Sequence, residues 1–361
     1  MDQIWRGRTV FLTGHTGFKG AWLSLWLSKL GAKVHGYALS PPSTPSLFEI
    51  GNVESVLAGH EIADVTNGAA LQAAVDRVRP DIIIHMAAQS LVREGYADPV
   101  TTYATNVMGT VNVLEAARHQ SSVRAVLVIT TDKCYENRGW VWGYRENDAL
   151  GGYDPYSNSK ACAELVVDSF RSSFFNPADY KSHGVAVASA RAGNVIGGGD
   201  WAKDRLIPDL VGSFARGEQP KIRSPHAIRP WQHVMEPLSG YLALSARLLG
   251  EGASYAQGWN FGPYQDDARP VSWVADRLVS EWGEGASWGL DDRVQPHEAS
   301  YLHLDSAKAA SLLDYRPRWR LEEALRQTVR WYRAYEAKED MRAVTLAQIA
   351  AFEAAAENRQ R

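Results

Sequence analysis

Short apolar runs alternate with longer amphipathic stretches through the first half of the chain. The runs at residues 9–13, 33–37, 82–86, 125–129 and 185–190 contain many β-branched residues and predict buried strands. Stretches at 19–30, 106–119 and 156–175 have the apolar spacing of helices. Because strands covered on both faces read as continuous apolar runs, this alternation predicts an α/β fold with a doubly wound parallel sheet.

The second half of the chain has a different pattern. After about residue 193, loops rich in glycine and proline occupy 196–208 and 224–237, and a helix is predicted at 237–249. We therefore predict a first domain over residues 1–192 and a smaller C-terminal α/β lobe over 193–361, with some segments of the lobe returning to the first sheet. Residues 321–337 and 341–357 predict an exposed pair of amphipathic helices.

Composition places the chain among compact globular proteins. Its 361 residues are 45% hydrophobic and 22% charged, which excludes a disordered or collagen-like chain. The 38 Lys and Arg against 41 Asp and Glu leave a net charge of -3, so the charge balance predicts no nucleic-acid partner and no anionic membrane surface. An anionic ligand must therefore be held by a local site.

The cysteine content and the first residues of the chain indicate the cellular compartment. Cys134 and Cys162 are too few and too irregularly spaced for a zinc site, so we predict no metal centre, and two free thiols fit a reducing compartment. Residues 1–8 lack the long apolar segment of a signal peptide, and no stretch reaches the apolar length that spans a bilayer. These features predict a cytoplasmic protein without a membrane span.

A glycine-rich turn joins the first predicted strand to the first predicted helix. Gly14, Gly17 and Gly20 recur at a spacing of three. Glycine allows the backbone to approach a pyrophosphate, and a helix N-terminus offers free N–H groups and a positive dipole end. The turn predicts a dinucleotide site in a Rossmann-type fold, held by seven consecutive residues: Gly14, His15, Thr16, Gly17, Phe18, Lys19 and Gly20.

A second motif lies at the start of the helix predicted at 156–175. Tyr156 and Lys160 are four residues apart, which places phenol and ammonium on one helix face. A nearby cation favours the phenolate, so a tyrosine with an ordinary pKa of ~10 can act as a base nearer neutrality. Tyr156 and Lys160 are therefore candidate catalytic residues.

The order of these motifs resembles the extended branch of the short-chain dehydrogenase/reductase superfamily. Ala87 and Ala88 match the alanine pair that ends a strand under the cofactor in that family, and Asp64-Val65 resembles its pair at the adenine edge. Residues 35–40 carry neither an acidic residue for a ribose hydroxyl nor an arginine for a 2'-phosphate, so the local chemistry leaves NAD and NADP open. The resemblance implies NAD, with these further contacts: Asp64, Val65, Ala87, Ala88, Gln89, Asn106, Tyr156 and Lys160.

The segment Thr131-Asp132-Lys133 resembles the Thr-Asp-Glu motif of sugar-nucleotide 4,6-dehydratases. There, threonine binds the sugar O4, the aspartic acid protonates the leaving O6, and the glutamate removes the C5 proton. Lys133 stands where many relatives have glutamate, and it can act as a base only if its surroundings lower its pKa below ~10.4. An ordinary loop cation paired with Asp132 is the alternative. Asp-Lys pairs resemble the CDP-glucose 4,6-dehydratase group and also some UDP-N-acetylglucosamine 4,6-dehydratases.

Segments at 152–157, 190–201, 204–209 and 228–233 resemble the CDP-glucose branch most, and the resemblance runs from about residue 7 to residue 335. It implies that Asn194 holds the substrate and that Arg229 binds the diphosphate, for which a planar guanidinium is suited. A surface salt bridge is the alternative for Arg205. The full set of predicted substrate contacts is Gln89, Asn194, Arg205, Leu206, Ile207, Pro208, Lys221 and Arg229.

The resemblance implies a lyase that dehydrates CDP-D-glucose to CDP-4-dehydro-6-deoxy-D-glucose through an internal hydride cycle on NAD. It also implies a homodimer or homotetramer formed through the helices at 106–119 and 156–175, and a setting in dideoxyhexose and O-antigen synthesis. Alternatives are dehydration of UDP-N-acetylglucosamine or GDP-mannose, and a C4 epimerase or reductase of the same fold, which would leave Asp132 and Lys133 without a role. A cofactor-sensing regulator would not need Tyr156 and Lys160.

Overall fold

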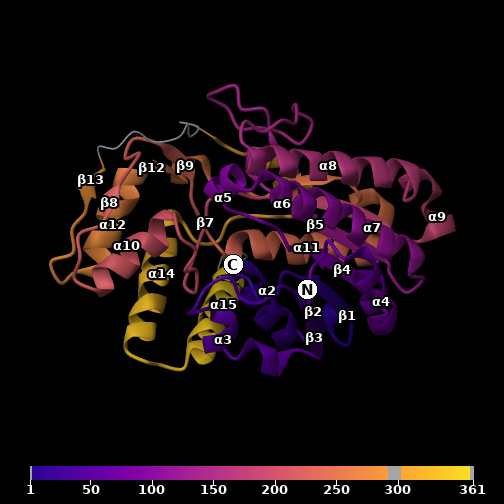
Figure 1. The fold of residues 1–361 in the computed structure, drawn as a ribbon, viewed down its shortest axis with the longest axis horizontal. Coiled ribbons are helices and arrows are strands. Elements are labelled where there is room, and N and C mark those ends of the chain that lie inside the picture. Colours follow the sequence, from indigo (N-terminus) through magenta and orange to yellow (C-terminus); the bar gives the residue numbers. More distant parts are fainter. Residues whose placement is uncertain (1, 292–301, 358–361) are drawn as a thin grey trace.

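The computed structural model of the protein describes residues 2–291 and 302–357. Its centre is a seven-stranded sheet in the order β11-β6-β5-β4-β1-β2-β3, in which every pair of neighbours is parallel (Figure 1). The strands are β1 (Thr9–Thr13), β2 (Lys33–Ala38), β3 (Gly59–Ile62), β4 (Ile82–His85), β5 (Ala125–Ile129), β6 (Ala186–Arg191) and β11 (Gly258–Asn260). Strand order reverses between β1 and β4, as in a Rossmann fold.

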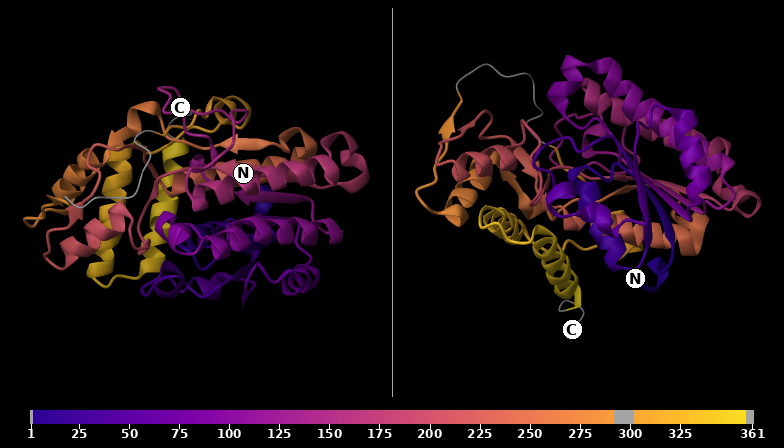
Figure 2. Two further views of the ribbon diagram at one scale, coloured as in Figure 1. Left: turned by 45° about the horizontal axis from the view of Figure 1, so that its top comes forward. Right: turned by 60° about the horizontal axis from the view of Figure 1, so that its bottom comes forward.

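Alternating side chains along the strands build two separate cores. Val10 and Leu12 of β1 belong to one hydrophobic cluster, whereas Phe11 between them belongs to the other. Helices α2 (Phe18–Lys29) and α11 (Met235–Glu251) pack on the first face, and α4 (Gly68–Val78), α7 (Gly109–His119) and α8 (Pro155–Ser173) cover the second (Figure 2). The predicted doubly wound α/β fold is confirmed.

Predicted and observed elements agree closely where the apolar pattern is strong. The strands expected at 9–13 and 125–129 are confirmed to the residue, and the helix expected at 156–175 is α8. The helix expected at 106–119 begins earlier, with a π-helical turn, η2 (Ala104–Met108), that continues into α7. Strand β3 and helix α4 lie outside the elements expected from the sequence. For β3 the reason is that its sequence, Gly-His-Glu-Ile, has no apolar run.

The second half of the chain contributes to both parts of the molecule. Strand β11 pairs with β6 at the edge of the large sheet, and α11 packs on β5 and β6. The remainder forms short two-stranded pairings and helices beside the strand ends. These elements are β7 (Val195–Ile196), β8 (Lys221–Ile222), β9 (Ile228–Pro230), β10 (Gln232–His233), β12 (Ala268–Pro270), β13 (Gly289–Leu290), α10 (Leu206–Ala215), α12 (Val271–Trp282) and α13 (Ala307–Leu312). The division at residue 192 stays a prediction.

The two C-terminal helices, α14 (Leu321–Glu336) and α15 (Met341–Glu357), are amphipathic as predicted, but the expectation of an exposed pair is wrong for their inner faces. Trp331 and Phe352 are completely buried. The indole Nε1 of Trp26 in α2 donates a 2.8 Å hydrogen bond to Oε1 of Glu353, so α15 is fastened to the first core. Aromatic residues on the inner faces bind the pair to the body of the molecule.

Short elements complete the chain. They are α1 (Asp2–Trp5), α3 (Leu47–Ile50), η1 (Val53–Val56), α5 (Val92–Ala97), α6 (Pro99–Tyr103), η3 (Asp132–Cys134), η4 (Pro177–Asp179), α9 (Tyr180–His183), η5 (Gly252–Tyr255) and η6 (Gln265–Asp267). Within the described residues, none of the helices has the length and apolarity to cross a membrane.

Candidate active site

The glycine turn follows β1 at the point where the strand order reverses. Gly14 has a φ of +78°, and a Cβ there would lie 2.7 Å from the backbone N of Ala87. A Cβ on Gly20 would lie 2.0 Å from the carbonyl oxygen of Gly14. Glycine is therefore required at both positions by close backbone packing. Helix α2 starts at Phe18 and has no side-chain cap at its N-terminus, so its first N–H groups are free to bind an anion.

The side chains of the turn point in different directions. His15 is buried against Gly36 of β2, with its Nε2 3.3 Å from Nδ1 of His60, and burial lowers its pKa to about 4. The hydroxyl of Thr16 donates to the carbonyl of Leu39 at 2.8 Å. His15 and Thr16 thus fasten the turn to the end of β2. Phe18 is half-buried beside Gly197.

Lys19 points to the reacting end of the site. Its Nζ lies 5.8 Å from the ring centroid of Tyr241. Burial lowers the pKa of Lys19 to about 8, and the charges of Lys160 and Arg205 lower it further, against the opposing charge of Asp132. The glycine turn therefore delivers a cation to the same place as the Tyr-Lys pair.

Tyr156 and Lys160 lie in the first turns of α8, which begins with Asp154 as its N-cap and Pro155 at its first position. Both side chains are buried. Lys160 donates from Nζ to the carbonyl oxygen of Ile129 at 3.1 Å, and burial lowers its pKa to about 8. Burial raises the pKa of Tyr156 to about 12, while a hydrogen bond with Thr131 and the charge of Arg205 lower it.

Thr131 and Asp132 follow β5 directly. Thr131 is the N-cap of η3, and its hydroxyl donates to Oδ1 of Asp132 at 3.0 Å. Asp132 is completely buried, and burial raises the pKa of its carboxyl above the ordinary value, against the opposing effects of Lys133, Thr131 and Arg229. Its Oδ2 is buried without a partner among the described residues. This carboxyl is therefore suited to hold a proton at neutral pH.

Several of the remaining predicted cofactor residues lie in or beside the segment that follows β4. The backbone N of Ala87 donates to Thr13 Oγ1 at 3.1 Å. Asn106, in the π-helical turn, accepts from the backbone N of Gln89 at 2.9 Å and donates to its carbonyl at 2.9 Å. Because Gln89 also donates its side-chain amide to Thr102, the amide is held in place locally. Half-buried Ala88 completes this segment.

Asp64 and Val65 lie after β3. Oδ1 of Asp64 accepts from the backbone N of Thr66 at 2.8 Å, and its carbonyl accepts from the hydroxyl of Tyr37 at 3.3 Å. Val65 is buried against Gly109 of α7. The structure therefore brings this pair to the same sheet edge as the glycine turn, on the side of β2 and β3.

The predicted substrate residues fall into two groups. The charge of Arg229 lowers the pKa of Asp132. Arg205 pairs with Asp200 at 2.8 Å and donates to Ser90 at 3.1 Å, and its charge lowers the pKa of Tyr156. Asn194 has a φ of +46°, and its buried Oδ1 has no hydrogen-bond partner in the part of the chain that the structure describes. By contrast, Lys221 is exposed on the small β8–β13 sheet. The segment after Arg205 opens α10, where Leu206 and Pro208 are half-buried and Ile207 is in the core.

Tyr241, Gly193 and Glu164 border the site but escape motif reasoning. Tyr241 is fully buried and has no partner for its hydroxyl among the described residues. A Cβ on Gly193 would lie 1.8 Å from Oδ2 of Asp132. Only Glu164 carried a sequence signal, because it continues the Tyr156–Lys160 spacing by a further four residues.

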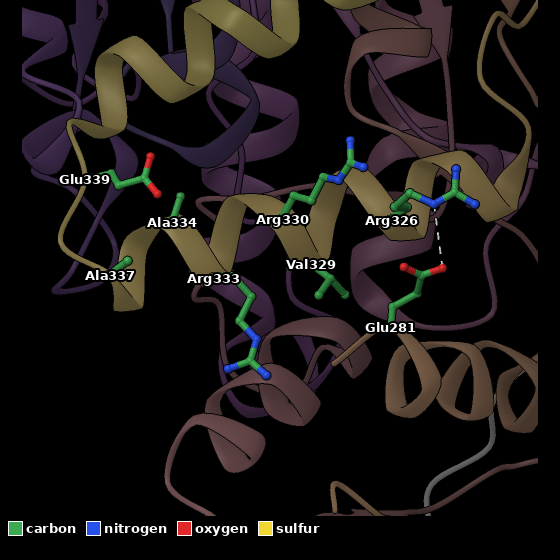
Figure 3. Close-up of a pocket in the computed structure, with 8 residues that line it drawn as sticks. All are labelled: Glu281, Arg326, Val329, Arg330, Arg333, Ala334, Ala337 and Glu339. Atoms are coloured by element: carbon green, nitrogen blue, oxygen red, sulfur yellow. Dashed lines mark ion pairs between the residues drawn. The ribbon is translucent and has the colours of Figure 1, made fainter. Parts of the chain in front are cut away.

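A hollow on the outer side of α14 lies outside this site (Figure 3). Arginines from one helix face line it, and Arg326 lies 3.7 Å from Glu281. Arg333 pairs with Glu284 at 3.1 Å and covers the ring of Trp282. Arg326 and Arg333 thus each have an acidic partner at this surface hollow. No group of three or more side chains suited to a metal ion occurs in the ranges 2–291 and 302–357.

A glycine turn after β1 and a buried Tyr-Lys pair on the helix after β5 define a protein of the extended short-chain dehydrogenase/reductase class. Residues 11–261 match the family described as GDP-mannose 4,6 dehydratase. The chain belongs to this family, and the predicted resemblance to sugar-nucleotide 4,6-dehydratases is confirmed.

Individual relatives make the similarity more specific. CDP-glucose 4,6-dehydratase of Salmonella typhimurium is 56% identical over 339 residues, which are 94% of each chain. dTDP-glucose 4,6-dehydratase of Streptomyces antibioticus is 30% identical over 282 residues, 76% of this chain and 75% of that protein. The solved dTDP-glucose 4,6-dehydratase of Bacillus anthracis, in complex with NAD, superposes with a TM-score of 0.73 at 21% identity, covering 93% of this chain and 100% of that one, and shares the fold.

Proposed function

We propose that this chain is a hydro-lyase that converts CDP-D-glucose to CDP-4-dehydro-6-deoxy-D-glucose and water. The observation that carries the proposal is one connected group at the end of β5, in which Thr131 is hydrogen-bonded both to Tyr156 and to Asp132. A base for a sugar hydroxyl and a neutral acid for a leaving hydroxyl are thereby placed side by side. The 56% identity to a CDP-glucose 4,6-dehydratase supports the choice of nucleotide sugar.

The site has the features that a bound NAD requires. Gly14 and Gly20 allow the close backbone packing that shapes the turn after β1, and the uncapped N-terminus of α2 presents N–H groups to a pyrophosphate. Bound NAD supplies the chemistry of accepting a hydride from C4 of the sugar and returning it to C6, so no net oxidation occurs. The residues that would hold it are those of the glycine turn, Asp64, Val65, Ala87, Ala88, Gln89, Asn106, Tyr156 and Lys160.

Tyr156 is the base for the sugar 4-hydroxyl. Its phenol is buried, so it needs a stabilising cation to become phenolate, and Lys160 stands one helical turn away on the same face. Thr131 adjoins Tyr156 and is placed to bond the sugar O4. The proton of the 4-hydroxyl passes to Tyr156 as C4 becomes a ketone, and this ketone makes the C5 hydrogen acidic.

Asp132 is the acid for the 6-hydroxyl. Because burial raises the pKa of Asp132, its carboxyl can enter the reaction protonated and give that proton to O6 as the C6–O6 bond breaks. Lys133, the next residue in η3, is the base that takes the C5 proton, and the electron pair of the C5–H bond forms the C5–C6 double bond. Water leaves, and C5 later recovers a proton.

We further propose that the protein acts as a homodimer or homotetramer in the cytoplasm. Apolar side chains are exposed on α6, on the π turn, on α8 and on the residue that follows α8: Val100 is 77%, Met108 52%, Leu165 58% and Phe174 47% exposed. Such a row on neighbouring helices suits burial against a second copy of the chain. Cys134 and Cys162 are both free thiols, which supports a reducing compartment.

The test is direct. The purified protein, with NAD added, is incubated separately with CDP-glucose, UDP-N-acetylglucosamine, dTDP-glucose and GDP-mannose, and mass spectrometry follows the loss of one water. Selective dehydration of CDP-glucose without net NADH is the expected result. Dehydration of another nucleotide sugar would keep the reaction and overturn the substrate. Net NADH without dehydration would overturn the roles given to Asp132 and Lys133.

A further inference from the structure

A buried ion pair lies directly beneath the Tyr-Lys pair. Glu164 follows Lys160 by one helical turn on α8, and its Oε2 lies 2.8 Å from Nη2 of Arg191 at the end of β6. The side chains are 3% and 6% exposed. A buried pair of this kind is costly to desolvate and is weak support for stability alone, so its presence here calls for another reason.

Glu164 bonds to the segments on both sides of it. The hydroxyl of Thr130, at the end of β5, donates to Oε1, and the hydroxyl of Ser189 in β6 donates to Oε2 at 2.6 Å. Both carboxylate oxygens therefore have partners. Although burial alone raises the pKa of Glu164, Arg191 and these hydrogen bonds outweigh it and lower the pKa, so the group is ionised at neutral pH.

Arg191 connects the ion pair to Tyr135, the residue that follows the segment 131–134. Its Nη1 donates to the hydroxyl of Tyr135 at 2.5 Å, and that hydroxyl donates to Oδ1 of Asn260 at 2.8 Å. Thr130 and Tyr135 directly flank the segment 131–134 in sequence. The Glu164–Arg191 pair is thus hydrogen-bonded to Thr130 and to Tyr135, the residues just before and just after the segment 131–134.

We propose that the buried Glu164–Arg191 ion pair is a positioning device of the active site. It holds the segment 131–134 in register with α8, and it keeps a fixed negative charge one turn below Lys160, which maintains the ammonium that Tyr156 needs. Glu164 and Arg191 are positioning residues, since neither touches the reacting groups. The inference rests on the proposed function for its catalytic meaning, whereas the electrostatic part concerns Lys160 in the free protein.

Electrostatics of Lys160 agree with this geometry. Burial lowers its pKa, and the charge of Glu164 is the largest effect that raises it again. Elements packed around Lys160 present other charged or titratable groups, namely Lys19 of α2, His85 of β4, Asp132 and Cys134 of η3, Tyr156 of α8 and Arg191 of β6.

The test replaces Glu164 by glutamine, which keeps the shape and an oxygen for Thr130 but removes the charge. In protein labelled with ¹³C at lysine Cε and assigned with a Lys160→Met variant, NMR titration follows the proton on Lys160. We expect Glu164→Gln to reduce the proton affinity of Lys160 about tenfold or more. We also expect kcat for dehydration to fall about tenfold or more, with KM changed by less than about threefold.

Two further variants separate positioning from general support. Glu236→Gln alters another fully buried glutamate, which accepts backbone N–H groups of Arg318 and Trp319 far along the chain, and should leave the Lys160 titration unchanged. The double variant Glu164→Gln with Arg191→Met removes both charges, so no guanidinium is left buried without its carboxylate partner. Lys160 in this variant should still titrate at a lower pH than in the wild type. The double variant gives the answer if the single one does not fold.

An unchanged Lys160 midpoint in Glu164→Gln or in the double variant would overturn the proposal, leaving the pair a structural contact. The titration needs no turnover. If the wild-type protein dehydrated no nucleotide sugar while the midpoint shifted as expected, the proposed function would fail and the electrostatic coupling would stand.

Discussion

The carboxyl group of Asp132 packs directly against the Cα of Gly193. A methyl group built at position 193 would lie 2.0 Å from Cγ and 1.8 Å from Oδ2 of Asp132. Gly193 follows β6 and Asp132 follows β5, so the contact forms where two neighbouring parallel strands end. The absence of a side chain at 193 is what allows a completely buried acid at this place.

Gly193→Ala should therefore displace the acid. The carboxyl cannot share the space of a methyl group, so we expect kcat for dehydration to fall about 100-fold or more, as for loss of a general acid. Steady-state rates with CDP-glucose measure it, and thermal unfolding shows whether the fold persists. Gly212→Ala in α10 is the control, because its added methyl meets only the guanidinium of Arg216, at 3.5 Å. Full activity in Gly193→Ala would contradict the role of Asp132.

Lys133→Gln removes the proposed C5 base and keeps a polar side chain that is one bond shorter. We expect kcat to fall by about 10²–10⁴. The specific readout is solvent exchange, because in D₂O the wild-type reaction should place one deuterium at C5 of the product. Lys181→Gln, on the remote helix α9, should react like the wild type. Unchanged dehydration by Lys133→Gln would show that another group takes this proton.

Lys19 should cost the protein stability near neutral pH. The pKa of Lys19 is about 8 in the folded protein, whereas a lysine in the unfolded chain has a pKa of ~10.4. Between these two pH values the unfolded chain binds more protons than the folded protein. The free energy of unfolding therefore rises with pH over this range. Lys19→Met should be more stable than the wild type by about 1–3 kcal/mol near pH 7, with the difference shrinking toward about pH 10. Urea unfolding at both pH values measures it.

The control for that experiment is Lys33→Met, at an exposed position that opens β2, which should change stability little at either pH. A Lys19→Met protein that is less stable than the wild type near pH 7 would contradict the burial of the ammonium.

Leu165→Glu should break the proposed oligomer. Leu165 is 58% exposed on α8, on the row of apolar side chains assigned to subunit contact, and a carboxylate there would be buried unpaired in an interface. Sedimentation velocity should show a monomer for Leu165→Glu and a dimer or tetramer for the wild type. Leu312→Glu, on an equally apolar position that is 52% exposed on α13, should not change the mass. A monomeric wild type would overturn the proposed oligomer, and oligomers of equal mass for all three proteins would place the interface elsewhere.

Much of the fold follows from sequence because its signals are local. Strand β5 is a run of five apolar residues, and α8 begins with an Asp-Pro cap, so both are visible in the chain itself. Strand β11 is not visible in this way. It has three residues, Gly258–Asn260, and becomes a strand only because the edge of β6 is there to pair with it.

The same distinction holds in the site. Tyr156, Lys160 and Asp132 stand in short motifs that a sequence displays, and the structure brings them together with Thr131. Gly193 lies after β6 and Tyr241 lies in α11, so the nearness of Gly193 to Asp132 and of Tyr241 to Lys19 is a product of tertiary packing. Lys221, by contrast, is exposed on β8, and its substrate role stays a prediction.

The pairing of β11 with β6 has a consequence for synthesis of the chain on the ribosome. Residues 186–191 emerge well before residues 258–260, and α11, which covers β5 and β6 on one face, also arrives late. Until then the nascent sheet has an unpaired edge and an uncovered layer of alanines, a state open to wrong association. We therefore expect a product truncated before residue 258 to lack the edge strand of the sheet and to expose apolar surface of the kind that chaperones recognise.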